Sequence, residues 1–133
     1  MKQQATGTFE VKMQPQGDGD VAAGSTLGRM SLDKRFSGDL EATGKGEMLA
    51  ARSDLPTSAA YVAIERVSGS LKGRDGSFAL VHKGVMTRDA QNLVIEVVPD
   101  TGTGRLAGIA GSLGIRIEEG RHYYDFEYTL PDE

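Results

Sequence analysis

Five side chains of the chain could do chemistry in one cavity if the fold brings them together. They are two tyrosines, one glutamate and both histidines of the sequence, namely Tyr61, Glu65, His82, His122 and Tyr124. A carboxylate or an imidazole can accept and release protons, and a phenol can donate a hydrogen bond or stabilise developing charge. We therefore predict that these five residues form a ligand-binding site.

Glu65 has the most unusual predicted surroundings of the five. Its strand face also carries Tyr61, Ala63 and Val67, so the carboxylate would lie among mostly apolar side chains. A buried carboxylate must find hydrogen-bond donors or take up a proton. Two interpretations stay open: Glu65 lines a functional pocket, or it belongs to a structural ion pair.

His82 and His122 both fall on predicted core faces. They lie forty positions apart in a chain without cysteine, whereas a metal site needs three or four converging ligands. We expect no metal and no cofactor. Each histidine either binds a ligand or is held by backbone or tyrosine hydrogen bonds, and His122 should lie partly wet near the end of a barrel.

The segment from Gly102 to Ala107 matches the glycine fingerprint of dinucleotide-binding proteins in its letters. That fingerprint works only when a helix follows it, and here a strand pattern follows. We predict a glycine-rich turn with no nucleotide role, with a local anion nest as the alternative. A serine-nucleophile motif is also absent from the sequence.

The elements that must position these residues are strands, and the clearest pair lies between residues 109 and 130. A turn at Glu119-Gly120 places apolar residues opposite one another on one face. The predicted pairs are Ile117 with His122, Ile115 with Tyr124, Leu113 with Phe126, Gly111 with Tyr128, and Ile109 with Leu130. This alternation in both strands is typical of an antiparallel hairpin with one buried side.

A second hairpin is predicted around Asp75-Gly76, a favoured two-residue turn. In this register Glu65 faces Met86 and His82 faces Gly69. Glu65 and His82 would then lie roughly 13 Å apart along the strands, too far for a direct pair.

The outer face of the second hairpin carries Val62, Ile64, Val81 and Val85. Either another subunit covers these residues, which would make the protein a homo-oligomer, or they are ordinary scattered surface residues of strands.

Further alternating segments complete a set of eight. Inward candidates are Phe9, Val11 and Met13, then Met30, Leu32 and Phe36, then Leu40, Ala42, Gly44, Gly46 and Met48, with a further short strand at 93–98. Short turns connect most segments. The pattern predicts a single all-β domain over residues 1–133, an eight-stranded antiparallel up-and-down barrel that is filled or holds one small ligand.

Composition narrows the class of protein. Among 133 residues, 15 basic and 19 acidic side chains give a net charge of -4 without a long basic run, so we expect no nucleic-acid partner. No apolar run reaches the roughly 20 residues of a membrane helix, so we expect no membrane association. The absence of cysteine and of a secretion signal favours a cytoplasmic location.

Several motifs resemble those of a bacterial family of uncharacterised single-domain proteins, domain-of-unknown-function family 3224. They lie at 7–11, 63–69, 76–82, 102–111 and 124–128 and span nearly the whole chain. The resemblance implies an allene oxide cyclase-like, calycin-like barrel and, by analogy with that plant enzyme, oligomerisation. It implies no activity, and no motif matches the catalytic residues of the cyclase.

Three functions follow as hypotheses. In the first, the lumen, lined by Phe78, Leu80, Tyr124 and Phe126, binds a small, largely apolar molecule that Glu65 or His82 orients. In the second, the protein is an isomerase or cyclase in which a lumenal glutamate or tyrosine moves a proton. In the third, the core is filled and the protein has a structural role.

Overall fold

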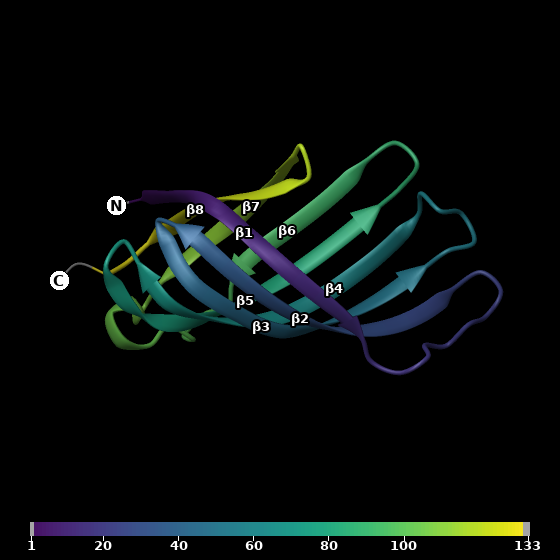
Figure 1. Cartoon of the computed structure of the whole chain (residues 1–133), viewed down its shortest axis with the longest axis horizontal. Helices are drawn as coiled ribbons and strands as arrows, with labels where there is room; N and C mark the ends of the chain where they lie inside the picture. The colour runs from purple at the N-terminus through teal and green to yellow at the C-terminus, as the bar shows by residue number, and fades with distance from the viewer. Residues whose placement is uncertain (1, 132–133) are drawn as a thin grey trace.

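The structure, a computed structural model, describes residues 2–131 and consists of eight antiparallel strands closed into one barrel (Figure 1). Each strand pairs with its neighbour in sequence, and the first pairs with the last. The strands are β1 (Gln3–Pro15), β2 (Thr26–Gly38), β3 (Leu40–Arg52), β4 (Ala59–Leu71), β5 (Arg74–Met86), β6 (Gln91–Val97), β7 (Ala110–Glu118) and β8 (Arg121–Thr129). The predicted up-and-down barrel is confirmed.

The register of the β7–β8 hairpin is as predicted. Ile115 pairs with Tyr124, Leu113 with Phe126, and Gly111 with Tyr128. Both turn residues, Glu119 and Gly120, have positive φ angles of 52° and 78°, as the tightest hairpin turns require. Apolar alternation and turn chemistry agree here, so the pattern alone defines the pairing.

The predicted register of the β4–β5 hairpin is wrong. The turn lies at Lys72 and Gly73, whose φ angles are 48° and 84°, and Glu65 pairs with Leu80 rather than with Met86, a shift of six residues along β5. An even shift keeps every side chain on its predicted face, because side chains alternate with a period of two. It changes the depth, however, and brings His82 next to Glu65.

One end of the barrel is filled by aromatic side chains. Phe126 stacks against Phe78 with ring centroids 5.6 Å apart and against Tyr128 at 5.1 Å. A short 3₁₀ helix, η1 (Gly104–Leu106), lies within the glycine-rich segment and adds the buried Leu106 to this end. The residues predicted to line a ligand lumen, Phe78, Leu80, Tyr124 and Phe126, are buried members of the hydrophobic core cluster.

The opposite end is wider and less covered. Strands β2 to β5 are thirteen residues long, whereas β7 and β8 have nine. Figure 1 shows the long strands extending beyond the β7–β8 turn. The wall is also thin between β6 and β7, which pair through the single residue pair Glu96–Ser112. Any space for a ligand must lie toward this open end.

Candidate functional site

Three charged or titratable side chains meet inside the barrel, between its filled and open ends. Oε1 of Glu65 accepts a hydrogen bond from Nζ of Lys34 at 2.9 Å and lies 2.6 Å from Nε2 of His82. The residues come from β2, β4 and β5, and all three are buried. We call Lys34, Glu65 and His82 the buried ion cluster.

Two glycines of β3 make room for the carboxylate. A Cβ atom added at Gly44 would lie 2.5 Å from Oε2 of Glu65, and one at Gly46 would overlap the backbone of β4 at Ile64 and Glu65. Any larger residue at either position would push the glutamate or its strand away. The run of small inward residues in β3 is thus explained by the bulk of Glu65 on the neighbouring strand.

The cluster holds Glu65 in its ionised form. Burial by itself would raise the pKa of this carboxyl, but the hydrogen bond with His82 and the positive charge of Lys34 outweigh burial and lower the pKa below its ordinary value. The carboxylate is therefore charged at neutral pH. Its interaction with an ammonium group in a poorly hydrated interior is stronger than the same pair on the surface.

Lys34 was missed by the sequence reasoning. It occupies an inward position of β2 between Leu32 and Phe36, and its ammonium group lies 5.2 Å from the ring centroid of Phe9 and 5.9 Å from that of Phe36. Aromatic faces attract cations, which offsets part of the cost of burying the charge. The alternating pattern of the sequence could have identified Lys34, because it puts this lysine on the apolar face of the strand, where a charged side chain needs a buried partner.

One oxygen of the cluster has no partner. Oε2 of Glu65 is buried and accepts no hydrogen bond from any residue in the described range 2–131. It lies close to Gly44, since a Cβ atom at that position would be 2.5 Å from it. The free oxygen therefore faces the wall of the barrel.

Tyr61 lies between the cluster and the open end. It is half-buried on the inward face of β4, and its ring lies against Gly84, where a Cβ atom would collide with it. Burial, and then the nearby charge of Glu65, raise the pKa of the Tyr61 hydroxyl. This hydroxyl stays protonated at neutral pH and can donate a hydrogen bond.

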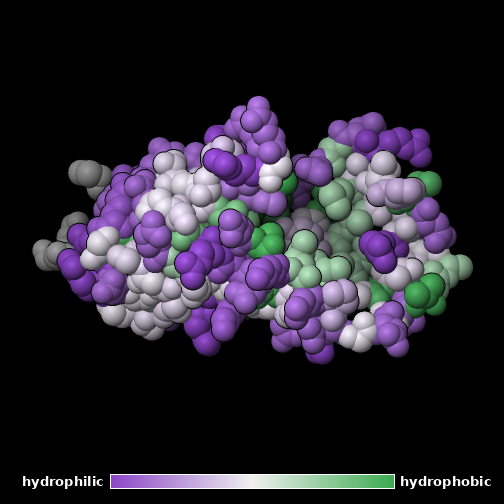
Figure 2. All heavy atoms as spheres, viewed as in Figure 1, coloured by the Kyte–Doolittle hydropathy of each residue, from purple (hydrophilic) through white to green (hydrophobic). Residues whose placement is uncertain are grey.

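A cavity of about 370 Å³ opens beyond Tyr61 at the wide end of the barrel. We call it the mouth cavity. Its walls include Val21, Met30, Met48, Ala50, Tyr61 and Met86, with Asp18, Arg29 and Arg52 as charged members. Figure 2 shows the surface hollowed over this half of the molecule, with apolar side chains in the recess.

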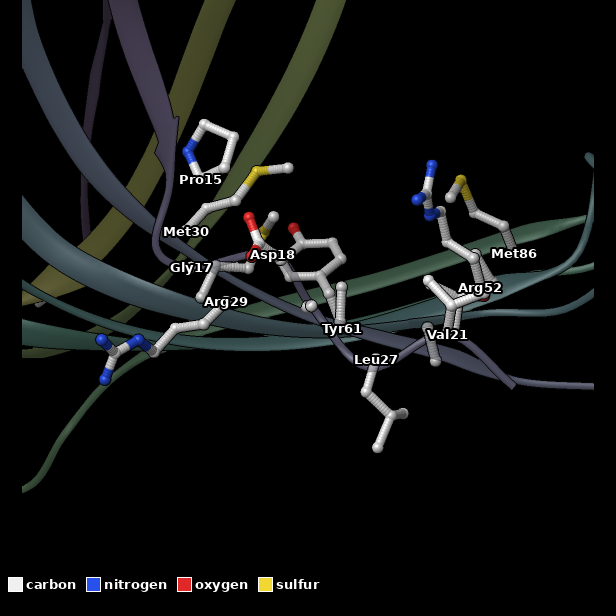
Figure 3. A pocket seen from close by; sticks show the side chains of 17 residues that line it. Pro15, Gly17, Asp18, Val21, Leu27, Arg29, Met30, Arg52, Tyr61 and Met86 are labelled. Atoms are coloured by element: carbon white, nitrogen blue, oxygen red, sulfur yellow. The ribbon is translucent and has the colours of Figure 1, made fainter.

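The side chains of the mouth cavity differ in direction (Figure 3). In this view Arg29 and Leu27 point away from the ring of Tyr61, while Arg52 stands beside Met86 at the other side. Methionine side chains are flexible and polarisable, and they adapt to ligands of irregular shape. The cavity has an apolar wall with a few polar groups, which is the usual character of a small-molecule site.

The other two predicted site residues lie away from the mouth cavity. The Tyr124 hydroxyl accepts a hydrogen bond from the Leu40 amide at 2.8 Å and donates to the Ser37 carbonyl at 2.9 Å, so it fastens β8 to the β2–β3 turn. His122 is half-buried and packs on Phe9 with ring centroids 5.1 Å apart. The fold thus brings together Glu65, His82 and Tyr61 only.

Two further observations concern other classes of site. Within residues 2–131, no group of three or more histidine, aspartate or glutamate side chains is placed to hold a metal ion. No helix in this range is long and apolar enough to cross a bilayer.

Comparisons with known proteins agree with the predicted family. A crystal structure of a protein of unknown function from the DUF3224 family of Shewanella oneidensis MR-1 superposes with a TM-score of 0.93. It shares 46% sequence identity with this chain, and the match covers 99% of this chain and 100% of that one. No protein of curated function matches. The likeness to the allene oxide cyclase barrel stays a prediction. The family model described as a protein of unknown function (DUF3224) matches residues 5–128, and the chain therefore belongs to the DUF3224 family.

Proposed function

We propose that the protein binds a small, largely apolar molecule in the mouth cavity. The observation that supports this proposal is a cavity of about 370 Å³ at the open end of the barrel, with three methionines and Tyr61 in its wall. Its volume falls in the range of about 300–1,000 Å³ that is usual for ligand sites. An apolar ligand would displace water from these side chains and gain binding energy from their burial.

The polar groups of the cavity would orient the ligand. The protonated Tyr61 hydroxyl offers a hydrogen bond near the floor, and Asp18 and Arg52 lie among the lining residues. A few such groups in an apolar wall provide specificity, while the apolar contact supplies most of the affinity.

Proton transfer by Glu65 has less support from the same geometry. Both of its neighbours in the cluster bind Oε1, and Oε2 faces Gly44, so neither oxygen is directed at the mouth cavity. Glu65 and His82 are also not among the residues that line the cavity. A general base must reach the proton it removes, which favours binding over catalysis here.

The test fills the cavity without disturbing the fold. Gly28 lines the mouth, and a Cβ atom there meets no other atom within 4 Å, so Gly28→Phe can place a ring in the opening. We expect this variant to lose affinity for the uncharged fluorescent dye phenylnaphthylamine by about tenfold or more, or 1.4 kcal/mol. Native mass spectrometry of the same proteins would report any ligand retained from the host.

The matched control is Gly114→Phe, since Gly114 is an exposed strand glycine whose nearest neighbour for a Cβ atom is 3.8 Å away. Gly114 does not line the mouth cavity. The control should bind the dye as the wild type does. Equal binding by wild type and Gly28→Phe, or no binding by the wild type, would refute the proposal.

A further inference from the structure

An apolar patch covers the outside of the barrel on one side. Six large apolar side chains are exposed there and lie close together across neighbouring strands. They are Leu27, Leu49, Val62, Ile64, Val81 and Val94, with exposures between 38% and 56%. We call these six residues the outer patch.

Strand pairing makes the outer patch continuous. Leu49 pairs with Val62 across β3 and β4, and Ile64 pairs with Val81 across β4 and β5. Val94 extends the Val62 row onto β6 through Lys83. Shallow grooves run along both rows, and Leu49 and Val62 line both of them.

The other side of the barrel has the opposite character. Outward positions of β1, β7 and β8 are mostly polar or charged, and the exposed charged residues there include Glu10, Lys12, Arg116, Asp125 and Glu127. Both sides are strand surfaces of the same barrel, so the preference of strands for β-branched residues does not explain the difference. A contiguous apolar area on one face marks a contact surface.

The charges within the patch fit a second copy of the same chain. Glu47 lies on β3 beside Ile64, and Lys83 lies on β5 beside Val62, so the two charges flank β4 on opposite sides. A two-fold axis that lies parallel to the sheet surface, crosses β4 between Val62 and Ile64 and runs perpendicular to the line from Glu47 to Lys83 would exchange these two positions. Each Lys83 would then face Glu47 of the other copy, at both edges of a shared apolar centre.

We infer that the outer patch is the interface of a two-fold symmetric homodimer, in which Val62 and Ile64 form the centre and Lys83 pairs with Glu47 of the partner. Such an interface is self-complementary, as a two-fold contact must be. Glu47 lies 3.6 Å from Arg29 in the single chain, and both are exposed, so the partner lysine can join this pair at the rim. Leu27 also lines the mouth cavity, but the inference does not depend on a ligand there.

Sedimentation equilibrium of the full chain tests the interface. We expect the wild type to reach twice its 14.2 kDa chain mass as concentration rises. Ile64→Arg should weaken association by about a hundredfold, because it puts a charge at the centre of the contact. The matched control is Ile117→Arg, since Ile117 is 62% exposed but lies outside the outer patch, and it should leave association unchanged.

A charge exchange tests the arrangement. Glu47→Lys and Lys83→Glu, each alone, bring like charges together and should weaken the dimer by about tenfold. The two changes combined restore opposite charges across the interface. Because Arg29 lies beside position 47 in both the single and the combined variant, the comparison is with Glu47→Lys alone, and the combined variant should associate at least about threefold more tightly than that variant. Circular dichroism confirms that each variant is folded.

Three results would overturn the inference. The first is a wild type that stays monomeric up to about 1 mM. The second is a dimer that Ile64→Arg leaves intact, and the third is a dimer that the combined charge exchange does not strengthen relative to Glu47→Lys alone. Either of the last two would assign the patch to another partner or the dimer to another surface.

Discussion

At the scale of single residues, the buried ion cluster is the most constrained feature of the protein. One carboxylate oxygen serves both Lys34 and His82, and the other is left without a partner among the described residues. Burying two charges is costly unless each compensates the other. Removing one of them leaves an uncompensated buried charge, and this costs more free energy of unfolding than the intact pair contributes. The three residues should therefore behave as a unit.

Replacing Lys34 should expose this dependence. Lys34→Met keeps an unbranched side chain out to the Cε position but removes the charged ammonium group, and we expect a loss of about 3–5 kcal/mol in the free energy of unfolding. The measurement is urea denaturation. Lys45→Met is the matched control at an exposed position of β3 and should change stability by no more than about 0.5 kcal/mol. A loss below about 1 kcal/mol for Lys34→Met would mean that Glu65 finds other compensation.

The lowered pKa of Glu65 predicts a pH dependence of stability. The unfolded chain takes up the Glu65 proton near the ordinary pKa of 4.5, and the folded chain does so only at lower pH. In between, the unfolded state binds more protons, so stability falls as pH decreases. The contribution of Glu65 is complete above the unfolded value and is lost through the folded one.

Glu65→Gln isolates this contribution from that of the other carboxylates. Unfolding free energies measured from neutral pH down to below pH 4.5 should fall more steeply for the wild type than for the variant. Parallel curves would show that Glu65 does not carry a lowered pKa.

At the scale of elements, strand β3 is shaped by its neighbour. Gly44 and Gly46 leave the space that the side chain and backbone of Glu65 occupy on β4. A glycine in a strand usually weakens it, because it adds no side chain to the packing. Here the loss is offset by a carboxylate that would otherwise not fit.

Gly44→Ala should be poorly tolerated. The added methyl group would lie 2.5 Å from Oε2 of Glu65, so the carboxylate must move away from Lys34 or His82. We expect a loss of about 1–3 kcal/mol in the free energy of unfolding, typical of overpacking. Gly28→Ala, at a strand glycine with open space around its Cβ position, should stay within about 0.5 kcal/mol of wild type. Equal effects of the two changes would contradict the role assigned to Gly44.

The elements also show what the sequence can and cannot predict. The alternating pattern placed Glu65 and His82 on the inner face correctly, because the face of a side chain depends only on whether its position in the strand is odd or even. Their separation was wrong, because it depends on which of two neighbouring turns forms. Asp75-Gly76 is the better turn by its letters, yet Gly76 is required inside the strand, where a Cβ atom would collide with Thr103.

The candidate site was predictable to the same degree. Glu65, His82 and Tyr61 were found because polar residues on an apolar face stand out, and Lys34 followed the same rule but was passed over. The mouth cavity could not be predicted, since it depends on how far the long strands extend beyond β7 and β8. Tyr124 and His122 were assigned to the site only because their positions point inward, and an inward position does not give the level along the barrel axis.

At the scale of the whole molecule, the barrel combines a solid end with an open one. Aromatic stacking fills the end near η1, and the ion cluster separates it from the mouth cavity. The wall is uneven as well: β3 and β4 pair along their whole length, whereas β6 and β7 share one residue pair. We therefore expect the β3–β4 part of the wall to be more rigid than the β6–β7 part.

Amide hydrogen exchange should reveal this uneven wall. Backbone amides in the β3–β4 ladder should exchange slowest, and those of β6 on the side of β7 should exchange fastest among the strands, since few of them are shielded by a partner. Uniform protection around the barrel would show that the β6–β7 contact is as firm as the others.

The hydrogen bonds made by Tyr124 have a consequence for folding during synthesis. A ribosome releases β1 to β5 well before β8, yet β8 supplies Phe126 at the centre of the solid end and the hydroxyl that holds the β2–β3 turn. The apolar inner face of the nascent sheet therefore stays exposed to solvent until the final strand emerges. A shortened chain ending before β8 should consequently be retained by ribosome-associated chaperones or precipitate.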